Sequence, residues 1–506
     1  MLIMKFGGTS VGTGERTLHV ARIVQAQRER HPVVVTSAMS GVTDFLLALA
    51  EAAANGERTI CERVLGDLRA RHLEAAQHIN PHASWERLSS RLASLDAAVE
   101  DALARRDGSA ATCDAIASFG ELLAVLLVAE ALRTLGEPVL AWEEPVIVTD
   151  DRFGDATPQM EATRAAVHRA LARADLRPIV GRSPDAPTSE YLQDAPAATL
   201  VAAGFIGQTA DGRPTTLGRG GSDYSAALLA AALDAEACWI YSDVDGVFTA
   251  DPRVVPDAEV LPRISAAAAG RLSYCGAKVL HPRSIAPVAR RGIELRVRNT
   301  FHPEQPGTLI EARLEGPRGR PQAVAGRRGL CAVGAVGDGA AEVPGLFGRL
   351  CAAILAAQGE IVQSAHPVVG HDPRAIVDET RIEAIVECLR REFAAERAQG
   401  QIEEIVVQKR LALCTLLGVQ LGHAQLVHAQ RALAAQRIKP ISQSACPDAL
   451  SFIIPEADLN RAIVRLHDEI IKPALRSGAE RPNRPYLDGA PPAGRARAQG
   501  RHGNAS

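Results

Sequence analysis

The chain alternates short β-rich runs with alanine- and leucine-rich stretches throughout residues 1–310. Parallel strands need long crossover connections, which are usually helices that cover both faces of the sheet. The alternation therefore predicts an α/β domain over residues 1–312, with a mainly parallel sheet sandwiched by helices. The strand candidates are Leu2–Gly7, Pro32–Ser37, Pro138–Trp142, Leu200–Gly207, Cys238–Val244 and Leu295–Asn299, and the helix candidates include Ser84–Arg106, Ser118–Leu135 and Ser222–Leu233.

The composition changes after this region. Residues 313–328 are rich in Gly, Pro and Arg and are predicted to be a linker. Two successive passes of strand, helix and strand follow, and they predict a duplicated small α+β module over 329–409 and 410–473. Residues 474–506 contain much Arg, Pro, Gly and Ala and few apolar side chains, which predicts a disordered tail. The Pro- and Ser-rich stretch 182–198 is interpreted as an inserted surface loop without an assigned role.

Charge, cysteines and hydropathy exclude several classes of protein. The formal net charge of −3 argues against nucleic acid or a membrane surface as the main partner. The nine cysteines are scattered without a CxxC pair, which favours small buried side chains in a reducing compartment over disulfides or a zinc site. We expect no leader peptide and no apolar run of the ~18 residues that a membrane-spanning helix requires. A cytoplasmic protein is therefore predicted.

The first turn of the chain is chemically distinctive. Lys5-Phe6-Gly7-Gly8-Thr9-Ser10-Val11 follows an apolar strand and precedes a helical segment. Glycines let backbone N–H groups approach an anion closely, and a helix N-terminus adds partial positive charge. The turn predicts a phosphate cradle, although the lysine opens the loop and does not close it as in a P-loop. An ordinary strand-to-helix turn is the alternative.

A second glycine-rich turn, Leu217-Gly218-Arg219-Gly220-Gly221-Ser222-Asp223, runs directly into a helix. Ser222 can cap that helix, and the glycines expose N–H groups at its positive end. Asp223 has two interpretations, because a carboxylate there would repel a phosphate: it is either a favourable helix-dipole charge, or it holds Lys5 or a metal ion in place. Two such turns suit a nucleotide and an acceptor that meet between them.

Two further motifs carry charged groups at turns. In Tyr241–Arg253 a β-rich run ends at Asp243, a position from which a carboxylate can contact a ribose or an adenine, and Arg253 is placed to reach a phosphate. A plain turn is also compatible with this segment. Gly276-Ala277-Lys278-Val279-Leu280-His281-Pro282 places another lysine, Lys278, at a glycine turn.

Together these motifs resemble the aspartate kinases. The matching segments, in the order found in that family, are KFGGTSVG (5–12), VTSAMSGVTD (35–44), SFGE (118–121), DRFG (151–154), GFIG (204–207), TLGRGGSDYSAALLA (216–230), SDVDGVFTADPR (242–253) and GAKVLHP (276–282). The resemblance implies the amino-acid-kinase (carbamate-kinase-like) fold over the first 310 residues. The duplicated module resembles the paired, ferredoxin-like ACT domains that follow the catalytic domain in that family.

The resemblance also implies a role for individual residues. Lys5 and Asp223 are implied to be catalytic, and no residue set is assigned to a protein-held metal. The residues implied to bind ATP are Lys5, Gly7, Gly8, Ser10, Ser242, Asp243, Phe248, Arg253 and Lys278. Those implied to bind the amino-acid substrate are Ser37, Thr43, Glu121, Arg152, Gly220 and Ser222. The charges agree with this, since Arg152 suits a carboxylate in bidentate fashion and Glu121 suits an ammonium group.

The implied reaction converts L-aspartate and MgATP to 4-phospho-L-aspartate and ADP, the first step towards lysine, threonine and methionine. The acceptor carboxylate is already ionised, so no general base is needed, and the motifs contain no histidine near a glycine turn. Phosphorylation of another acceptor, such as glutamate, acetylglutamate or a nucleotide, is disfavoured because SFGE and DRFG together accompany aspartate in this fold. A non-catalytic amino-acid-binding regulator is disfavoured by intact Lys5, Asp223 and Asp243.

Regulation is less constrained by the sequence. Lysine, threonine, both or neither remain possible effectors, and homo-oligomerisation through the small modules is expected from the family. The first module keeps a helix-opening Pro344-Gly345, whereas the second has Gly422-His423 in the corresponding place. The second module is therefore either an amino-acid sensor or a purely structural dimerisation module. No dinucleotide-binding motif follows residue 470, so a fused homoserine dehydrogenase is not expected.

Overall fold

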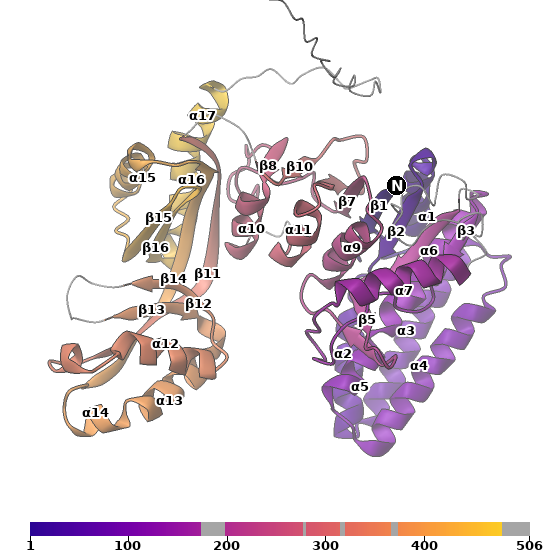
Figure 1. Cartoon of the computed structure of the whole chain (residues 1–506), viewed down its shortest axis with the longest axis horizontal. Helices are drawn as coiled ribbons and strands as arrows, with labels where there is room; N and C mark the ends of the chain where they lie inside the picture. The colour runs from indigo at the N-terminus through magenta and orange to yellow at the C-terminus, as the bar shows by residue number, and fades with distance from the viewer. Residues whose placement is uncertain (174–197, 277–279, 314–318, 366–372, 478–506) are drawn as a thin grey trace, which may run out of the picture.

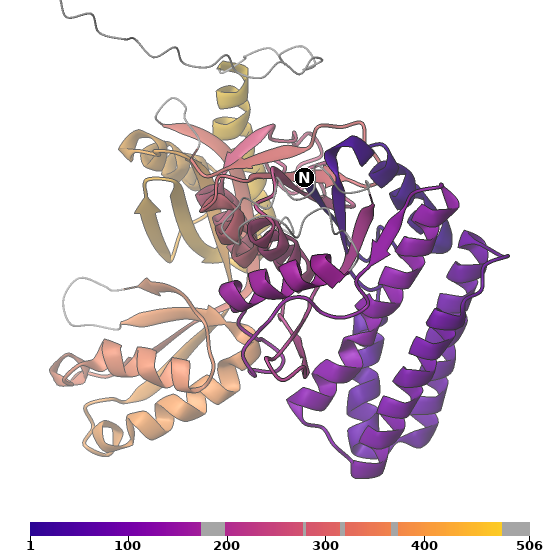
Figure 2. The same cartoon turned by 45° about the vertical axis from the view of Figure 1, so that its right-hand side comes forward.

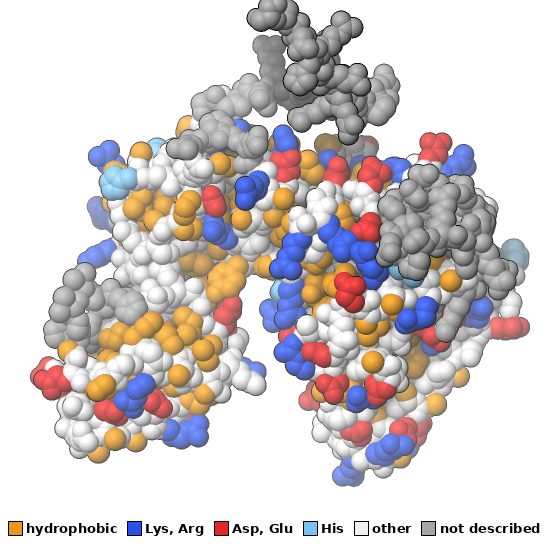
Figure 3. All heavy atoms as spheres, in the orientation of Figure 1, with side chains coloured by type: hydrophobic (Ala, Val, Ile, Leu, Met, Phe, Trp, Pro, Cys, Tyr) orange, Lys and Arg blue, Asp and Glu red, His pale blue; other side chains and the backbone are white. Residues whose placement is uncertain are grey.

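The computed structural model describes residues 1–173, 198–276, 280–313, 319–365 and 373–477. It contains two lobes that lie side by side (Figure 1). The first lobe is built on an eight-stranded sheet, and the second on a six-stranded sheet. A space-filling view shows an open gap between the lower parts of the lobes, with Lys and Arg side chains gathered on the edge of the first lobe that faces this gap (Figure 3).

The sheet of the first lobe is mainly parallel, as predicted. Its strand order is β3-β4-β2-β1-β7-β9-β10-β8, and among these pairs β9–β10 is antiparallel. All residues of β1 and β2 are buried, which is typical of strands covered on both faces. The strands are β1 (Leu2–Phe6), β2 (Pro32–Thr36), β3 (Val139–Ala141), β4 (Thr199–Ala203), β7 (Ala237–Ser242), β8 (Arg263–Ser265), β9 (Glu294–Asn299) and β10 (Thr308–Glu311).

Two layers of helices cover this sheet, and the alternation of β1 shows how. Leu2, Met4 and Phe6 belong to one hydrophobic core and Ile3 to another, because successive strand side chains point to opposite faces. The first core includes a bundle of helices that extends beyond the sheet (Figure 2). Its helices are α1 (Gly14–Gln25), α2 (Val42–Asn55), α3 (Arg58–Ile79), α4 (Glu86–Arg105), α5 (Ala110–Ala117) and α6 (Phe119–Thr134), and the second core includes α7 (Met160–Arg173), α9 (Gly221–Ala232), α10 (Ala266–Tyr274) and α11 (Pro282–Ala289).

Helices α5 and α6 contradict the expectation that the chain has no long apolar run. Together they run from Ala110 to Thr134 as 25 residues that are apolar enough by length and composition to cross a membrane, whereas the sequence was expected to contain no such run. The physical reason for this composition is position: 83% of the apolar window is buried inside the protein. Contacts with α1, α3 and α4 surround α6, so the segment is the central helix of the first core.

The second lobe is antiparallel, with strand order β12-β13-β11-β14-β16-β15. Two long strands, β11 (Arg320–Val336) and β14 (Glu404–Val419), pair with each other along most of their length and are shared by both halves of the sheet. The other strands are β12 (Ile361–Ala365), β13 (Arg374–Asp378), β15 (Ser442–Cys446) and β16 (Ala449–Pro455). The helices are α12 (Leu346–Ala356), α13 (Ile382–Glu392), α14 (Ala394–Ala398), α15 (His423–Ala435), α16 (Leu459–Leu466) and α17 (Lys472–Ser477).

The predicted linker 313–328 is too long, because strand β11 occupies its second half. The strand begins at Arg320, and residues 320–327 pair with 413–419 of β14, so most of the assigned linker is sheet. Buried Ala323 and Val324 carry this half of the strand, while interspersed Gly, Pro and Arg hide its apolar pattern in the sequence. The second half of the sheet therefore takes its outer strand from a segment that precedes the first half.

At the other end of the chain, α17 includes residues 474–477 of the predicted disordered tail, because the helical segment continues past residue 473. Residues 478–506 lie outside the described residues, as does nearly all of the predicted surface loop 182–198.

The two lobes share a buried junction at the loop after β7. The carbonyl of Thr249 accepts a hydrogen bond of 2.8 Å from the Val324 N–H in β11. The Thr249 hydroxyl lies 3.0 Å from Nε2 of His467, and both side chains are buried. Ala250 and Val255 belong to the hydrophobic core of the second half of the six-stranded sheet. This loop of the first lobe is thus built into the interior of the second.

Candidate active site

The two glycine-rich turns meet at an ion pair. Lys5 lies near the end of β1, and its Nζ is 2.6 Å from Oδ1 of Asp223 in the first turn of α9. The two side chains are only 10% and 18% exposed. Of the two interpretations of Asp223, the structure favours the one in which its carboxylate holds Lys5. A partly buried pair of this kind fixes the direction of the lysine ammonium.

Glycine is required where these turns approach their neighbours. A Cβ on Gly8 would lie 2.8 Å from the Ala38 carbonyl oxygen, so the β1 turn packs backbone to backbone on the segment after β2. Gly220 has φ +72°, and a Cβ there would lie 2.5 Å from Cβ of His281. Gly220 is also the residue that caps α9, so the expectation that Ser222 caps this helix is wrong: Ser222 lies within the first turn.

The position of His281 overturns a second expectation. No histidine was expected near a glycine turn, yet tertiary packing places His281 against Gly220, which is remote from it in the sequence. His281 caps α11 by accepting a hydrogen bond of 3.3 Å from the Arg283 N–H. Burial lowers the pKa of His281, and the nearby Arg283 and Arg219 guanidinium groups lower it further.

Ser10 makes a buried contact with the residue after β9. Its side chain is fully buried, and its Oγ lies 2.6 Å from Oγ1 of Thr300, which follows β9. Gly7 does lie beside the lysine, since a Cβ there would be 3.5 Å from Nζ of Lys5. In this structure the Ser10 hydroxyl anchors the turn to the segment after β9, and its assignment to the nucleotide site stays a prediction.

Glu121 is a buried carboxylate with a free oxygen. It lies in the first turn of α6 and is 2% exposed. Its Oε1 accepts a hydrogen bond of 3.2 Å from the Ala38 N–H, whereas Oε2 has no hydrogen-bond partner among the described residues. Burial raises the pKa of Glu121 to about 8. Ser37 immediately precedes Ala38, and Thr43 lies in the first turn of α2. Two predicted substrate residues thus belong to the segment 37–43, and the third, Glu121, contacts this segment at Ala38.

Arg152 is exposed in the loop before α7 and is engaged locally. Its side chain is 69% exposed, and Nε donates a hydrogen bond of 2.9 Å to Oδ2 of Asp150. The guanidinium group also contacts the Thr157 hydroxyl. No described contact joins Arg152 to Glu121, so the structure shows the arginine on a nearby loop without bringing it to the other predicted substrate residues.

Two of the predicted nucleotide residues, Ser242 and Asp243, lie at the end of β7 beside the lysine turn. Strand β7 pairs in parallel with β1, with Tyr241 opposite Phe6, so Ser242 and Asp243 emerge next to Gly7. Asp243 is exposed. Phe248 is half-buried and Arg253 is 81% exposed, with its guanidinium 2.7 Å from Asp251. Lys278 lies outside the described residues.

One cluster of side chains has metal-ligand character. Among the described residues, Asp257, His467 and Asp468 each offer a ligand atom, and these atoms lie within 4.8 Å of one another. The Lys472 ammonium is 2.7 Å from Oδ1 of Asp468 and also contacts Asp257, so an internal cation already neutralises both carboxylates. This cluster is therefore interpreted as an ion-pair network.

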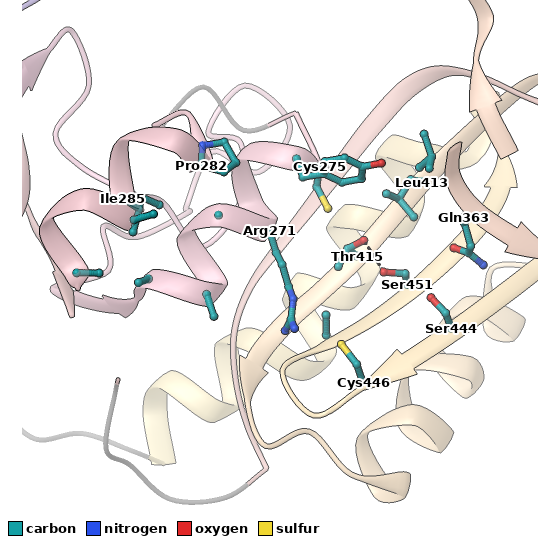
Figure 4. A pocket seen from close by; sticks show the side chains of 18 residues that line it. Arg271, Cys275, Pro282, Ile285, Gln363, Leu413, Thr415, Ser444, Cys446 and Ser451 are labelled. Atoms are coloured by element: carbon teal, nitrogen blue, oxygen red, sulfur yellow. Dashed lines mark hydrogen bonds between the residues drawn. The ribbon is translucent and has the colours of Figure 1, made fainter. Parts of the chain in front are cut away.

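A cavity of about 640 Å³ lies between the two lobes (Figure 4). Helices α10 and α11 form one wall, and β12, β14, β15 and β16 form the other. Arg271 of α10 extends towards the wall formed by the strands, where its Nη1 is 3.3 Å from Asp448. Cys446 is an exposed thiol on that wall, whereas Cys275 on the opposite wall is buried.

Comparisons with known proteins identify similar chains and similar folds. Lysine-sensitive aspartokinase 3 of Escherichia coli is 35% identical over 318 residues, which cover 63% of this chain and 65% of that protein. A chloroplastic bifunctional aspartokinase/homoserine dehydrogenase of Zea mays is 28% identical over 480 residues, which cover 92% of this chain and 50% of that protein. The chain spans about half the length of the bifunctional relatives that it matches.

Two solved structures of E. coli aspartokinase III match most of the chain. The complex with aspartate and ADP (R-state) has a TM-score of 0.74 and 28% identity, and covers 93% of this chain and 100% of that one. The complex with lysine and aspartate (T-state) has a TM-score of 0.73 and 29% identity, with 93% and 99% covered. The model of the amino acid kinase family matches residues 1–299, which is the whole first lobe up to the end of β9. The chain belongs to the amino acid kinase family.

Proposed function

We propose that this protein is an aspartate kinase, which transfers the terminal phosphoryl group of ATP to the β-carboxylate of L-aspartate and forms 4-phospho-L-aspartate and ADP. The observation that carries the proposal is the Lys5–Asp223 pair, which places an oriented ammonium between two glycine-rich turns. The aspartate- and ADP-bound relative supports it, because this chain covers the whole of that structure. The reaction would be the first step towards lysine, threonine and methionine.

Lys5 acts on the transferring phosphoryl group in this proposal. The β-carboxylate of aspartate is ionised at neutral pH, so the reaction depends on in-line positioning and on neutralising charge at the phosphoryl oxygens. Asp223 holds the lysine ammonium so that it needs no reorganisation during the reaction. Gly7 and Gly8 contribute a turn on which backbone N–H groups can face the nucleotide. The packing of this turn also requires a glycine at position 8, where a Cβ would lie 2.8 Å from the Ala38 carbonyl oxygen.

The residues present also fit a magnesium ion. Mg²⁺ is usually held by one or two carboxylates together with substrate phosphates. Asp223 lies in the first turn of α9 and contacts Lys5, and Asp243 directly follows β7, which pairs with β1 beside the lysine turn. When bound, the ion would neutralise charge on the phosphate oxygens.

The substrate side of the site is built around Glu121 and Arg152. The unpartnered Oε2 of Glu121 can accept a hydrogen bond from the substrate ammonium, and this charge would favour the ionised form of the buried carboxylate. Arg152 can bind the α-carboxylate through its planar fork. It must first leave Asp150, and this exchange costs little because exposed ion pairs contribute ~0–1 kcal/mol.

Lysine is the proposed effector, and threonine is the alternative. The relatives include an enzyme named for its lysine sensitivity and a solved complex with lysine. The first half of the regulatory sheet is the better candidate for binding it, because the N-terminus of α15 in the second half is already occupied: Gly422 N–H donates to Gln425 Oε1 at 2.9 Å. Homo-oligomerisation through the regulatory sheet and a cytoplasmic location stay predictions, since the relatives include chloroplastic proteins.

The test is ADP release together with hydroxylamine trapping of the acyl phosphate. Purified protein is incubated with MgATP and with L-aspartate, L-glutamate or N-acetylglutamate, each with and without lysine or threonine. The proposal expects a hydroxamate with aspartate alone and inhibition by lysine. A hydroxamate from a different acid would reassign the substrate, and folded protein that forms none with any acid would remove the proposed activity.

A further inference from the structure

Asp114 of α5 is a buried carboxylate that the family resemblance leaves without a role. It is 2% exposed and accepts three hydrogen bonds from residues far away in the sequence. Its Oδ2 accepts from the Gly154 N–H at 2.8 Å and from the Thr216 N–H at 2.8 Å. Its Oδ1 accepts from the Thr216 hydroxyl at 2.7 Å. A carboxylate can accept hydrogen bonds at about four lone-pair sites, and three of them are used here to join two loops.

These two loops carry the charged groups of the proposed site. Gly154 stands two residues after Arg152, and Thr216 opens the glycine-rich turn that ends at Asp223. A direct backbone bond also joins the loops, since Ala156 N–H donates to the Thr216 carbonyl at 2.9 Å. The Asp114 carboxylate is thus the common partner of the loop that would bind the substrate carboxylate and of the loop that orients Lys5.

The helical segment 110–134, which contains Asp114, also contains Glu121, the proposed ligand of the substrate ammonium. Asp114 and Glu121 are seven residues apart, which is about two helical turns, so they lie on the same side of the continuous segment 110–134. That segment is the central, buried helix of the first lobe, so it cannot shift easily. A rigid spacer of ~10 Å therefore separates the group that would hold the substrate ammonium from the group that holds the two loops.

We propose that Asp114 is a positioning residue that sets the distance between Glu121 and the loops of Arg152 and Asp223. Asp114 touches neither substrate nor nucleotide. It holds the loops in place, so that the substrate ammonium can reach Glu121 and the α-carboxylate can reach Arg152 while the β-carboxylate lies at the phosphoryl-transfer site. The inference rests on the proposed function and adds a residue to that site. Displacement of a substrate-positioning loop by ~1 Å costs about a hundredfold in catalysis.

Three substitutions test this role. Asp114→Ala removes all three hydrogen bonds. Asp114→Asn keeps an oxygen for both N–H groups, and its amide can donate to the Thr216 hydroxyl, which can accept as well as donate. Thr216→Val removes the hydroxyl alone. We expect Asp114→Ala to raise KM for aspartate about tenfold to a hundredfold with a smaller change in KM for ATP, Thr216→Val to do so more weakly, and Asp114→Asn to restore most of the loss.

Asp107 offers a matched control. It lies just before the same helix and accepts the same kinds of hydrogen bond, from Ser109 N–H at 2.8 Å and from the Thr112 hydroxyl at 2.6 Å, but these partners are local. Asp107→Ala should weaken the start of α5 and leave KM for aspartate unchanged. If Asp114→Ala and Asp107→Ala lower stability equally and leave both KM values unchanged, Asp114 is a purely structural residue and the proposal is overturned.

Hydrogen exchange separates this inference from the proposed function. The Gly154 and Thr216 amides are held by Asp114, so Asp114→Ala should accelerate their exchange in the full-length protein, while Asp107→Ala should not. If wild-type protein phosphorylates no amino acid, the proposed function fails whatever the exchange shows. If the two amides exchange no faster in Asp114→Ala than in wild type, the carboxylate does not hold the loops, and the positioning role fails even for an active kinase.

Discussion

Nζ of Lys5 lies 2.6 Å from Oδ1 of Asp223, and this contact joins a turn that follows the first strand of the chain to a helix more than two hundred residues later. Both side chains are shielded from water, so the pair is better defined than a surface ion pair. Its geometry aims the ammonium into the space between the two glycine-rich turns. Five experiments follow from this relationship and from other contacts of the structure.

Lys5→Ala should lower kcat by a factor on the order of 10²–10⁴, because it removes a charge that is oriented towards the transition state. Initial rates of ADP release measure this effect, and far-UV circular dichroism checks that the variant is folded. Lys472→Ala is a suitable control. It also removes a lysine that is paired with aspartate side chains, in this case two of them, but it leaves the glycine-rich turns unchanged. Near-normal kcat in folded Lys5→Ala would show that another group carries the phosphoryl charge.

The pH dependence of aspartate binding should follow Glu121. Burial raises the pKa of this carboxyl from 4.5 to about 8, so near neutral pH the free folded protein holds a proton there that must leave when an ammonium binds. KM for aspartate should therefore fall as the pH rises from about 6 to about 8. Glu121→Gln should raise KM and flatten this slope, which steady-state kinetics over the pH range will measure.

The same pKa shift predicts how stability varies with pH. Between pH 4.5 and about 8 the folded protein keeps the Glu121 proton while the unfolded chain has released it. The stability that this proton contributes is present below pH 4.5 and is lost as the pH rises towards 8. Urea unfolding of wild type and Glu121→Gln should show a difference in free energy that changes in this direction. A pH-independent difference would mean that the carboxyl is ionised in the free enzyme.

Val255→Ala should disturb nucleotide binding from a distance. Val255 is buried in the hydrophobic core of the second half of the regulatory sheet, but it lies two residues after Arg253 on the loop that would bind ATP. The cavity should cost about 1–3 kcal/mol of stability and should raise KM for ATP more than KM for aspartate. Val333→Ala makes the same change in the first half of the sheet, away from this loop, and should lower stability without the effect on ATP.

Alkylation should show which thiols on the two walls of the cavity between the lobes are accessible to solvent. Cys446 is the exposed thiol among the nine cysteines, whereas Cys275, directly after α10 on the opposite wall, is buried and burial raises its pKa. Iodoacetamide should therefore label Cys446 first and Cys275 only after denaturation, as read by peptide mass spectrometry. Fast labelling of Cys275 in native protein would show that the two walls separate readily in solution.

The sequence was sufficient for the parts of the site that are written in local motifs. The β1 turn, the α9 turn and the end of β7 were recognised from glycines and charges, and the parallel sheet predicted from the alternation accounts for their meeting. The Lys5–Asp223 contact could be proposed because a carboxylate in a phosphate-binding turn needed a reason.

Other features could not be predicted because tertiary packing decides them. Strand β11 was hidden by Gly, Pro and Arg residues whose role depends on pairing with β14. His281 reaches Gly220 only through the packing of α11 on α9. Asp114 carries no local signal, and the helix predicted over residues 118–135 did not include it.

The two long strands of the regulatory sheet have a consequence for dissecting the protein. Because β11 and β14 each run through both halves, a fragment that starts at residue 329 would lose the strand that completes the second half, and a cut near residue 410 would sever β14 in its middle. Neither half can be excised as an autonomous piece. The regulatory lobe should melt in one cooperative step, and any truncation that preserves one half must carry the other with it.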